Sequence, residues 1–266
     1  MLRTLWRALR RPAVPPLTGP ASLPAGIRLY AVGDVHGHIA ELDALLDKIR
    51  SDHQRRGPVS SALLVFLGDY IDRGPDSKAV ISRLLDLSSP AGGGFTCHCL
   101  MGNHEASLLQ FLDNPQQSEL WFQYGALETL ASYGVSPLTG HSRPERRTDM
   151  RDQLLAALPS SHLDFFRSLP PCLHLGEYLF VHAGIRPGLL PEEQAPDDMI
   201  WMREPFLSST ANHGVMVVHG HTITEKPDLQ KNRIGIDTGV YESGCLTALG
   251  LEGTQQWLLQ AGGPSA

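Results

Sequence analysis

The sequence predicts an α/β fold in which helices cover a parallel β-sheet. Apolar runs rich in strand-forming residues alternate with segments whose apolar residues recur at helical spacing. Each of the first three apolar runs ends at a glycine followed by polar residues. The apolar fraction of 42% in 266 residues is enough to fill the core of one domain, which excludes a disordered chain.

The first part of the predicted domain follows a β-α-β-α-β pattern. Its elements are a strand at 27–32, a helix at 41–50, a strand at 62–67, a helix at 77–87 and a strand at 95–101. In parallel sheets of this kind, ligands bind at the carboxyl ends of the strands. We therefore expect the functional residues directly after the strands.

The second part begins with a mostly helical stretch, residues 106–169, which we interpret as a helical cap inserted into a domain that spans residues 27–261. Four further strands are predicted at 178–181, 214–218, 233–236 and 245–251, with a last one at 257–260.

Residues 1–26 precede the predicted domain as a basic, proline-rich tether. Arginines and apolar residues alternate at helical spacing over residues 1–11, which favours a frayed or self-docked helix. The alternative is an amphipathic anchor that makes a weak contact with an anionic membrane surface. The sequence contains no apolar run of bilayer length and no secretory signal pattern.

Composition and charge exclude several classes of function. Lys and Arg number 22 against 28 Asp and Glu, and the net charge of −6 argues against a nucleic-acid partner. Four cysteines are too few for a disulfide scaffold, so we expect a reducing, cytoplasmic setting. Twelve histidines make imidazole and carboxylate better candidates than thiolate as metal ligands.

Polar clusters follow the predicted strands at regular spacing. Asp34 and Asp69 are 35 residues apart, and Asp69 and Asn103 are 34 apart, which is about one β-α unit each. Parallel strands would bring the three side chains together at one edge of the sheet. A single Gly-Asp is usually a turn, but converging carboxylates, amides and imidazoles are costly to bury unless a metal binds them. Mixed oxygen and nitrogen ligands suit Mn, Fe or Zn.

Five short motifs stand in order along the chain: GDVHG at 33–37, GDYIDRG at 68–74, GNHE at 102–105, VHAG at 181–184 and GHT at 220–222. Together they resemble the calcineurin-like metallophosphoesterases, and most closely the phosphoprotein phosphatase branch with its bacterial serine/threonine protein phosphatases. The resemblance covers about four-fifths of the chain. It implies a β-sandwich of mixed sheets flanked by helices, and a site for two divalent metal ions, with Mn as our first expectation.

The resemblance assigns roles residue by residue. For the metals, Asp34 and His36 match ligands of the first ion, Asp69 bridges both, Asn103 and His182 match ligands of the second, and His221 completes the first-ion side. The neighbouring His219 is the competitor for that last position, but the Gly-His-Thr context favours His221.

The remaining roles concern the phosphate and the proton. His104 resembles the general acid and Asp72 the carboxylate that orients it, while Arg73, Arg203 and Asn103 resemble phosphate-binding groups. A water that two metal ions share can ionise near neutral pH, and the resulting hydroxide can attack phosphorus in line. An imidazolium is suited to protonate the departing oxygen.

These features predict a phosphomonoester hydrolase similar to serine/threonine protein phosphatases. Its substrate would be a phosphorylated protein or a small phosphomonoester, and we expect a monomer. The alternative within the family is a symmetrical dinucleoside polyphosphate hydrolase that cleaves diadenosine tetraphosphate. A non-catalytic scaffold that binds phosphorylated partners ranks lower because every expected ligand is intact, and the acidic charge disfavours a nuclease.

Overall fold

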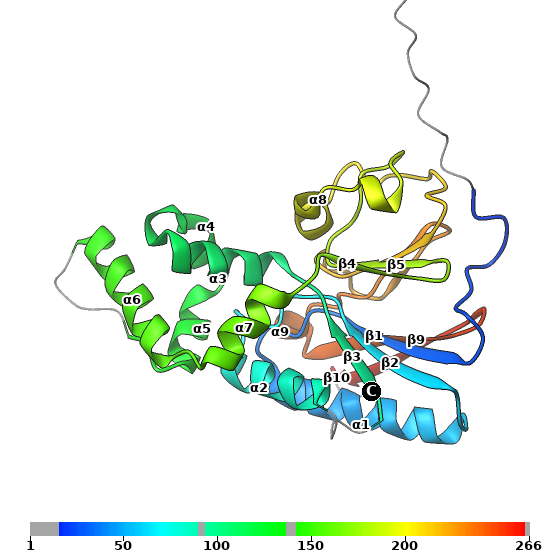
Figure 1. Ribbon diagram of the computed structural model, residues 1–266, viewed down its shortest axis with the longest axis horizontal. Coiled ribbons are helices and arrows are strands. Elements are labelled where there is room, and N and C mark those ends of the chain that lie inside the picture. Colours follow the sequence, from blue (N-terminus) through cyan, green and yellow to red (C-terminus); the bar gives the residue numbers. More distant parts are fainter. Residues whose placement is uncertain (1–15, 90–93, 137–141, 264–266) are drawn as a thin grey trace, which may run out of the picture.

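The computed structural model describes residues 16–89, 94–136 and 142–263. Two five-stranded mixed sheets pack face to face, helices α1 and α2 lie beneath the first sheet, and a group of helices projects from one end (Figure 1). This is the predicted α/β sandwich of mixed sheets, so the fold class is confirmed. No helix in these three ranges is long and apolar enough to cross a membrane.

The first sheet has the strand order β10-β9-β1-β2-β3. Its strands are β1 (Ile27–Val32), β2 (Ser61–Phe66), β3 (Thr96–Cys99), β9 (Cys245–Glu252) and β10 (Gln255–Gly262). Strands β1, β2 and β3 run parallel, with Val32 opposite Phe66 and Phe66 opposite Cys99. The carboxyl ends of the three strands are therefore aligned, as the spacing of Asp34, Asp69 and Asn103 predicts.

The second sheet has the order β4-β5-β6-β8-β7. Its strands are β4 (Cys172–Leu175), β5 (Tyr178–Val181), β6 (Met216–His219), β7 (Asp228–Leu229) and β8 (Arg233–Gly235). Strands β5, β6 and β8 run parallel and bring the segments after them to the same end of the molecule. The short strands β4 and β7 are absent from the predicted elements.

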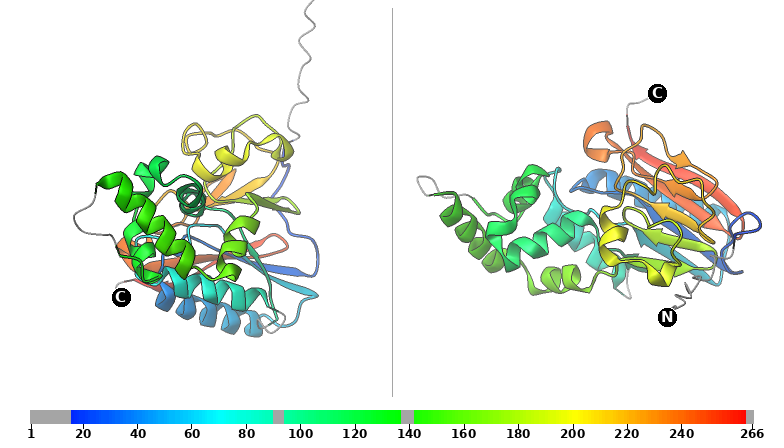
Figure 2. Two further views of the ribbon diagram at one scale, coloured as in Figure 1. Left: turned by 60° about the vertical axis from the view of Figure 1, so that its left-hand side comes forward. Right: turned by 90° about the horizontal axis from the view of Figure 1, so that it is seen from above.

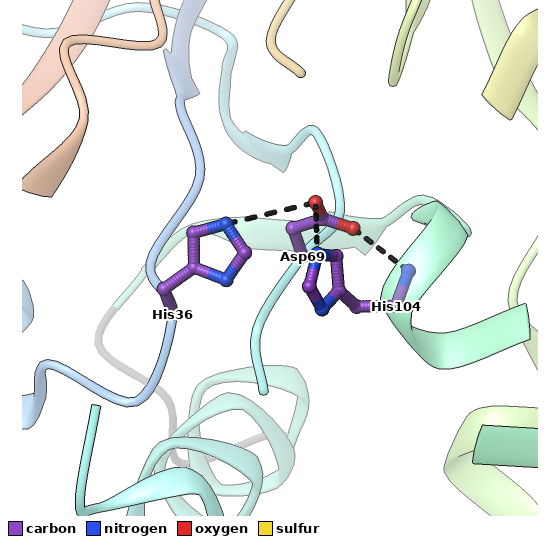
Figure 3. Close-up of side chains that lie close together, drawn as sticks. All are labelled: His36, Asp69 and His104. Atoms are coloured by element: carbon purple, nitrogen blue, oxygen red, sulfur yellow. Dashed lines mark hydrogen bonds and ion pairs between the residues drawn. The ribbon is translucent and has the colours of Figure 1, made fainter. Parts of the chain in front are cut away.

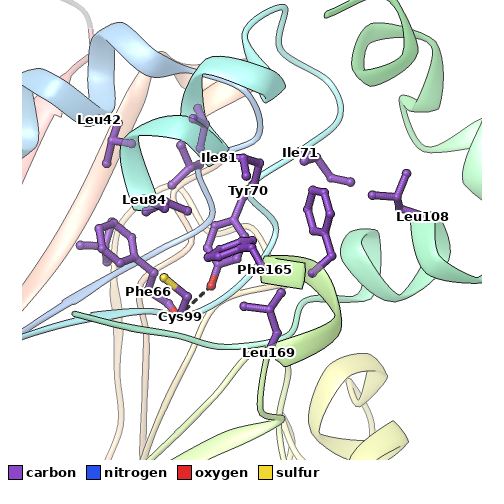
Figure 4. Close-up of a cluster of buried hydrophobic side chains, with 14 of the residues drawn as sticks. Leu42, Phe66, Tyr70, Ile71, Ile81, Leu84, Cys99, Leu108, Phe165 and Leu169 are labelled. Carbon is purple, nitrogen blue, oxygen red and sulfur yellow. Dashed lines mark hydrogen bonds between the residues drawn. The ribbon is translucent and has the colours of Figure 1, made fainter. Parts of the chain in front are cut away.

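Both faces of the central strands β1, β2 and β9 are buried, which explains why these strands read as continuous apolar runs. Leu29 and Val65 face the second sheet and pack against Phe180 and Val218. Tyr30 and Phe66 alternate with them and point the other way, toward α1 (Ile39–Arg55) and α2 (Ser77–Ser88). Figure 4 shows this outer core, in which side chains of the projecting helices join those of α1 and α2.

Seven helices lie outside the layer formed by α1 and α2. They are α3 (Asn103–Asp113), α4 (Glu119–Gln123), α5 (Ala126–Ser132), α6 (Arg143–Ala157), α7 (Ser160–Ser168), α8 (Pro196–Trp201) and α9 (Val240–Ser243). Short 3₁₀ helices occur at Pro115–Gln117 and Pro191–Glu193. Figure 2 shows α3 to α7 extending from one end of the sheets, in the region predicted as a helical cap.

The chain packs against the sheets before the predicted boundary at residue 26. Ala21 and Leu23 are buried in the core between the sheets, and the amide of Leu23 donates to the carbonyl of Gly253. Leu17 exchanges backbone hydrogen bonds with the side chain of Asn212. Residues 17–24 are therefore docked rather than an extended tether, while the predicted membrane contact of residues 1–11 lies outside the described residues.

Candidate active site

The predicted site residues come together at one end of the two sheets. Most follow β1, β2, β5 and β6 or begin α3, Arg203 follows α8, and a cavity of about 270 Å³ opens between them. Seven of them line the cavity: His36, Asp69, Arg73, Asn103, His104, Arg203 and His221. Asp34, Asp72 and His182 are buried directly behind this surface.

The backbone at the site is strained. Five non-glycine residues in the described ranges have positive φ angles: His36 (43°), Asp69 (52°), Asp72 (71°), Arg73 (70°) and His221 (62°). Such angles are unfavourable for residues with a Cβ and concentrate at functional sites. All five belong to the predicted site, so the tight turns after the strands aim these side chains at a common point.

Asp69 is the centre of the cluster. Its Oδ2 lies 3.3 Å from Nε2 of His182 and 3.7 Å from Nε2 of both His36 and His104. Its Oδ1 accepts the backbone amide of His104 at the first turn of α3, at 3.1 Å (Figure 3). Two groups of side chains with the reach to hold a metal ion share this carboxylate: His36, Asp69 and His104, and Asp69, His182 and His221.

The protonation of the imidazoles suits metal binding. Nδ1 of His36 lies 2.9 Å from the carbonyl of Ile71, and Nδ1 of His182 lies 3.1 Å from that of Leu67. A carbonyl oxygen only accepts, so each Nδ1 carries a hydrogen and each ring turns its Nε2 toward Asp69. Burial lowers the pKa of His36 to about 3, which keeps this ring neutral.

Further ligand-type atoms gather around His182. Its Nε2 lies 2.8 Å from Oδ1 of Asn103. Nδ1 of His221 lies 3.2 Å from the same Nε2, and Nε2 of His221 is buried without a hydrogen-bond partner among the described residues. A cation would give this nitrogen a partner, so the donor set fits divalent metal ions.

The structure corrects the side to which His221 belongs. The resemblance implied the first ion, with Asp34 and His36, but the His221 ring groups with Asp69 and His182 on the second-ion side. Only its backbone amide contacts Asp34, whose Oδ2 it meets at 3.0 Å. The turn that follows β6 directs the ring toward the end of β5, the neighbouring strand. His219, the competitor, turns away and packs on Phe206.

Asp34 lies beside a second buried carboxyl group, Asp237, which follows β8. Burial and the charge of Asp237 raise the pKa of Asp34, and burial raises that of Asp237 to about 6. Two buried carboxylates are stabilised in the ionised form by a nearby cation. Gly220 packs so closely that a Cβ would overlap Oδ1 of Asp34. Asp237 also accepts the backbone amide of Gly239 at 2.9 Å, which holds the turn after β8.

His104 and Asp72 form a hydrogen-bonded pair, with 2.6 Å between Nδ1 and Oδ2. Burial opposes the protonation of His104, but Asp69 and Asp72 outweigh it and raise its pKa to about 9. Two residues of the projecting helices hold Asp72: Nε1 of Trp121 donates to Oδ2 at 2.7 Å, and Oγ1 of Thr129 donates to Oδ1 at 2.5 Å. No local motif marks these two residues in the sequence.

Glu105 organises the turn that carries Asp69. Its buried carboxylate accepts the backbone amides of Asp69 at 2.9 Å, Tyr70 at 2.7 Å and Gly102 at 3.1 Å. Glu105 is fully buried and joins the turn after β2 to the start of α3.

Cationic and aromatic side chains complete the cavity. The Arg73 guanidinium lies 4.8 Å from the ring centre of Tyr241 and 6.0 Å from that of Tyr124. On another side, Nη2 of Arg203 donates to the carbonyl of His221 at 3.3 Å, and Trp201 lines the cavity beside it. The three aromatic residues come from separate segments, and the sequence analysis did not identify them.

The sequence is similar to that of known phosphoesterases. A family profile described as calcineurin-like phosphoesterase matches residues 27–264. The chain is 27% identical over 236 residues to the bis(5'-nucleosyl)-tetraphosphatase PrpE (asymmetrical) of Halalkalibacterium halodurans, a match that covers 82% of this chain and 87% of that protein. It is 32% identical over 169 residues to the symmetrical bis(5'-nucleosyl)-tetraphosphatase of Acidovorax sp., and this match covers 62% of the chain and 47% of that protein.

Solved structures share the fold. A mutant of a cold-active protein tyrosine phosphatase superposes with a TM-score of 0.58 at 18% identity, covering 91% of this chain and 83% of that one. A protein serine/threonine phosphatase of Saccharomyces cerevisiae superposes with a TM-score of 0.55 at 16% identity, covering 91% and 81%. At these identities the likeness extends to the architecture alone.

Proposed function

The chain belongs to the calcineurin-like phosphoesterase family, and from this premise we propose that it is a two-metal hydrolase that cleaves the phosphate chain of bis(5'-nucleosyl) tetraphosphates. One observation carries the proposal. The metal-ligand types His36, Asp69, Asn103 and His221 line the same cavity as the guanidinium groups of Arg73 and Arg203, and Nε2 of His221 is buried without a hydrogen-bond partner among the described residues. Such a site binds divalent cations and phosphate together.

The metals would be held by side chains from both sheets. We assign Asp34, His36 and Asp69 to one ion and Asp69, Asn103, His182 and His221 to the other. The mixture of carboxylate, amide and imidazole ligands keeps Mn as the first choice, with Fe or Zn as alternatives. When bound, the metals supply an activated water and neutralise charge on the phosphate.

The chain's own residues bind the phosphate and move the proton. Arg73 and Arg203 are positioned to neutralise phosphoryl oxygens from two sides of the cavity, and the amide group of Asn103 borders the same space. His104 would donate its proton from Nε2 to the departing oxygen. Asp72 holds the opposite ring nitrogen at 2.6 Å, which fixes the ring and stabilises its charged form.

The choice of substrate reverses the order expected from the sequence. The matched relatives that extend over most of the chain are tetraphosphatases, whereas the protein phosphatases resemble it in fold alone. A serine/threonine phosphatase activity, on a phosphorylated protein or a small phosphomonoester, remains the second candidate. The His104–Asp72 pair favours it, because an alkoxide leaving group needs a proton more than a nucleotide does.

A comparison of substrates tests the proposal. Protein stripped with EDTA and reconstituted with Mn is assayed on diadenosine tetraphosphate and on a phosphothreonine peptide, with the stripped protein as control. We expect kcat/KM for the dinucleotide to exceed that for the peptide by at least about tenfold, which is about 1.4 kcal/mol in transition-state binding. The opposite order would support the second candidate. Chromatography of the products separates symmetrical cleavage to two ADP from asymmetrical cleavage to AMP and ATP.

We also propose a domain organisation, a cellular setting and an oligomeric state for the chain. We propose that residues 106–169 act as the cap of a domain spanning 27–261, because Trp121 and Thr129 reach from there to Asp72. A reducing, cytoplasmic setting agrees with the four cysteines, Cys97, Cys99, Cys172 and Cys245, which are all free thiols. The expected monomer is tested by light scattering.

A further inference from the structure

An exposed tryptophan stands at the cavity in a run of otherwise buried apolar residues. Met199, Ile200 and Met202 are between 4% and 7% exposed, whereas Trp201 is 41% exposed. A single exposed apolar residue is common on protein surfaces, so the place of this indole in a cavity matters more than its exposure. Trp201 lines the same cavity as the metal-binding side chains.

The backbone holds Trp201 firmly in this place. The carbonyl of Met199 accepts the amide of Ala183, next to His182, at 2.7 Å, and the carbonyl of Asp198 accepts the amide of Met202 at 3.0 Å. Arg203 donates to the carbonyl of His221 at 3.3 Å. The segment around Trp201 is therefore tied to the turns that carry His182 and His221.

Ile223 adds a second exposed apolar side chain to the lining of the cavity. It is 39% exposed, lines the same cavity, and follows His221 by two residues. Gly239 approaches it so closely that a Cβ there would lie 2.8 Å from Cγ2 of Ile223, which fixes the side chain on the turn after β8. Trp201 and Ile223 are the two exposed large apolar side chains that line the cavity, and we refer to them together as the apolar wall.

The other aromatic residues of the cavity are already engaged. Tyr241 packs against the Arg73 guanidinium at 4.8 Å and meets the His36 ring at 5.2 Å, and Tyr124 lies 6.0 Å from Arg73. Trp201, by contrast, meets His221 edge to face, with 6.4 Å between ring centres and an angle of 83°. Among the described residues, no further ring or guanidinium group stacks on the Trp201 indole. Its face is open to a ligand.

We propose that the wall of Trp201 and Ile223 is a nucleobase subsite. The base of a nucleotide whose phosphate lies at the metal centre stacks on Trp201, while Arg203 contacts the phosphate chain between them. This inference rests on the proposed function for its choice of ligand. An apolar side chain of a phosphopeptide is the competing occupant, but it would gain little from a planar indole beside a phosphate-binding arginine.

The test compares two ligands that differ only in the base. AMP and ribose 5-phosphate are titrated as competitive inhibitors of p-nitrophenyl phosphate hydrolysis by the Mn-reconstituted protein. Stacking predicts that AMP binds about tenfold more tightly than ribose 5-phosphate. Trp201→Ala should reduce this ratio to near one, and Trp201→Phe should restore much of it. Leu229→Ala, which alters a 57% exposed leucine outside the cavity, is the matched control and should keep the full ratio.

A second readout does not depend on turnover. AMP should quench tryptophan fluorescence, ribose 5-phosphate should not, and Trp201→Phe should abolish the quenching. An equal ratio in the wild type and Trp201→Ala, with both folded by thermal melting, would overturn the subsite. If diadenosine tetraphosphate is not hydrolysed while AMP keeps its advantage, the subsite stands and the proposed substrate fails. If the dinucleotide is hydrolysed without a base-dependent ratio, the substrate stands and the subsite fails.

Discussion

Replacement of Asp69 by asparagine is expected to lower kcat/KM by about 10³-fold or more. Asp69 is the one carboxylate that belongs to both metal-binding groups, with Oδ2 within 3.3–3.7 Å of three imidazole nitrogens. Asparagine keeps the shape and the hydrogen bond from the amide of His104, but it removes the negative charge that two cations would share. Metal stabilisation of the transition state amounts to several kcal/mol, which corresponds to a loss of this size.

The measurement combines steady-state kinetics with metal content by mass spectrometry. In Asp69→Asn, kcat/KM and the metal content should fall together. Circular dichroism should show that the variant still folds. Asp47→Asn changes an exposed aspartate that pairs with Arg50 on α1, and it should behave like the wild type. Full activity with an unchanged metal content in Asp69→Asn would exclude a bridging role.

Replacement of His104 by asparagine is expected to lower kcat by about 10²- to 10³-fold on substrates with a poor leaving group, with little change in metal content. Loss of a general acid has this magnitude. The loss should be much smaller on p-nitrophenyl phosphate, whose leaving group departs without a proton. This dependence on the leaving group separates proton donation from a structural role. Asp72→Asn should produce the same pattern in weaker form, because Asp72 acts through the His104 ring.

His174→Asn is the matched control for this substitution, since His174 is exposed on β4. It should leave both kcat and metal content unchanged. Nε2 of His104 also lies within reach of the first metal group, so His104 could be a metal ligand instead of a proton donor. If His104→Asn loses metal in proportion to activity, and equally on all substrates, His104 is a ligand rather than the proton donor.

The main architecture could be predicted from the sequence because it depends on local signals. Buried parallel strands read as apolar runs, and strand 178–181 matches β5 at both ends. The helix predicted at 41–50 extends to Arg55, because the polar residues of its last turn are used in packing. Asp52, for example, accepts hydrogen bonds from Tyr30 and Trp257. Strands β4 and β7, with four and two residues, are too short to carry a periodic signal.

The candidate site could also be predicted only in part from the sequence. Each residue that we propose as a metal ligand stands in a short motif after a strand, so its type and position could be found in the sequence. The side of the centre on which His221 lies depends on which strands are neighbours, and the order β5-β6-β8 is a tertiary property. Trp121, Thr129 and Trp201 reach the site from helices whose packing no local pattern specifies.

The charge at the candidate site differs from the net charge of the whole chain. The chain as a whole is acidic, yet Arg73 and Arg203 face the cavity together with the acceptors for two divalent cations. With both metals bound, the cavity would be locally positive on an acidic protein. This arrangement favours capture of a compact phosphate group over attraction to a long polyanion.

The central claim is that two divalent cations share Asp69, and their number per chain can be measured directly. The apoprotein is titrated with Mn, bound metal is counted by mass spectrometry after gel filtration, and diadenosine tetraphosphate hydrolysis is followed at each step. The structure predicts two bound ions per chain, with activity that rises as the second site fills and is lost in EDTA. Full hydrolysis by metal-free protein, or by protein saturated with a single ion, would contradict the two-metal account.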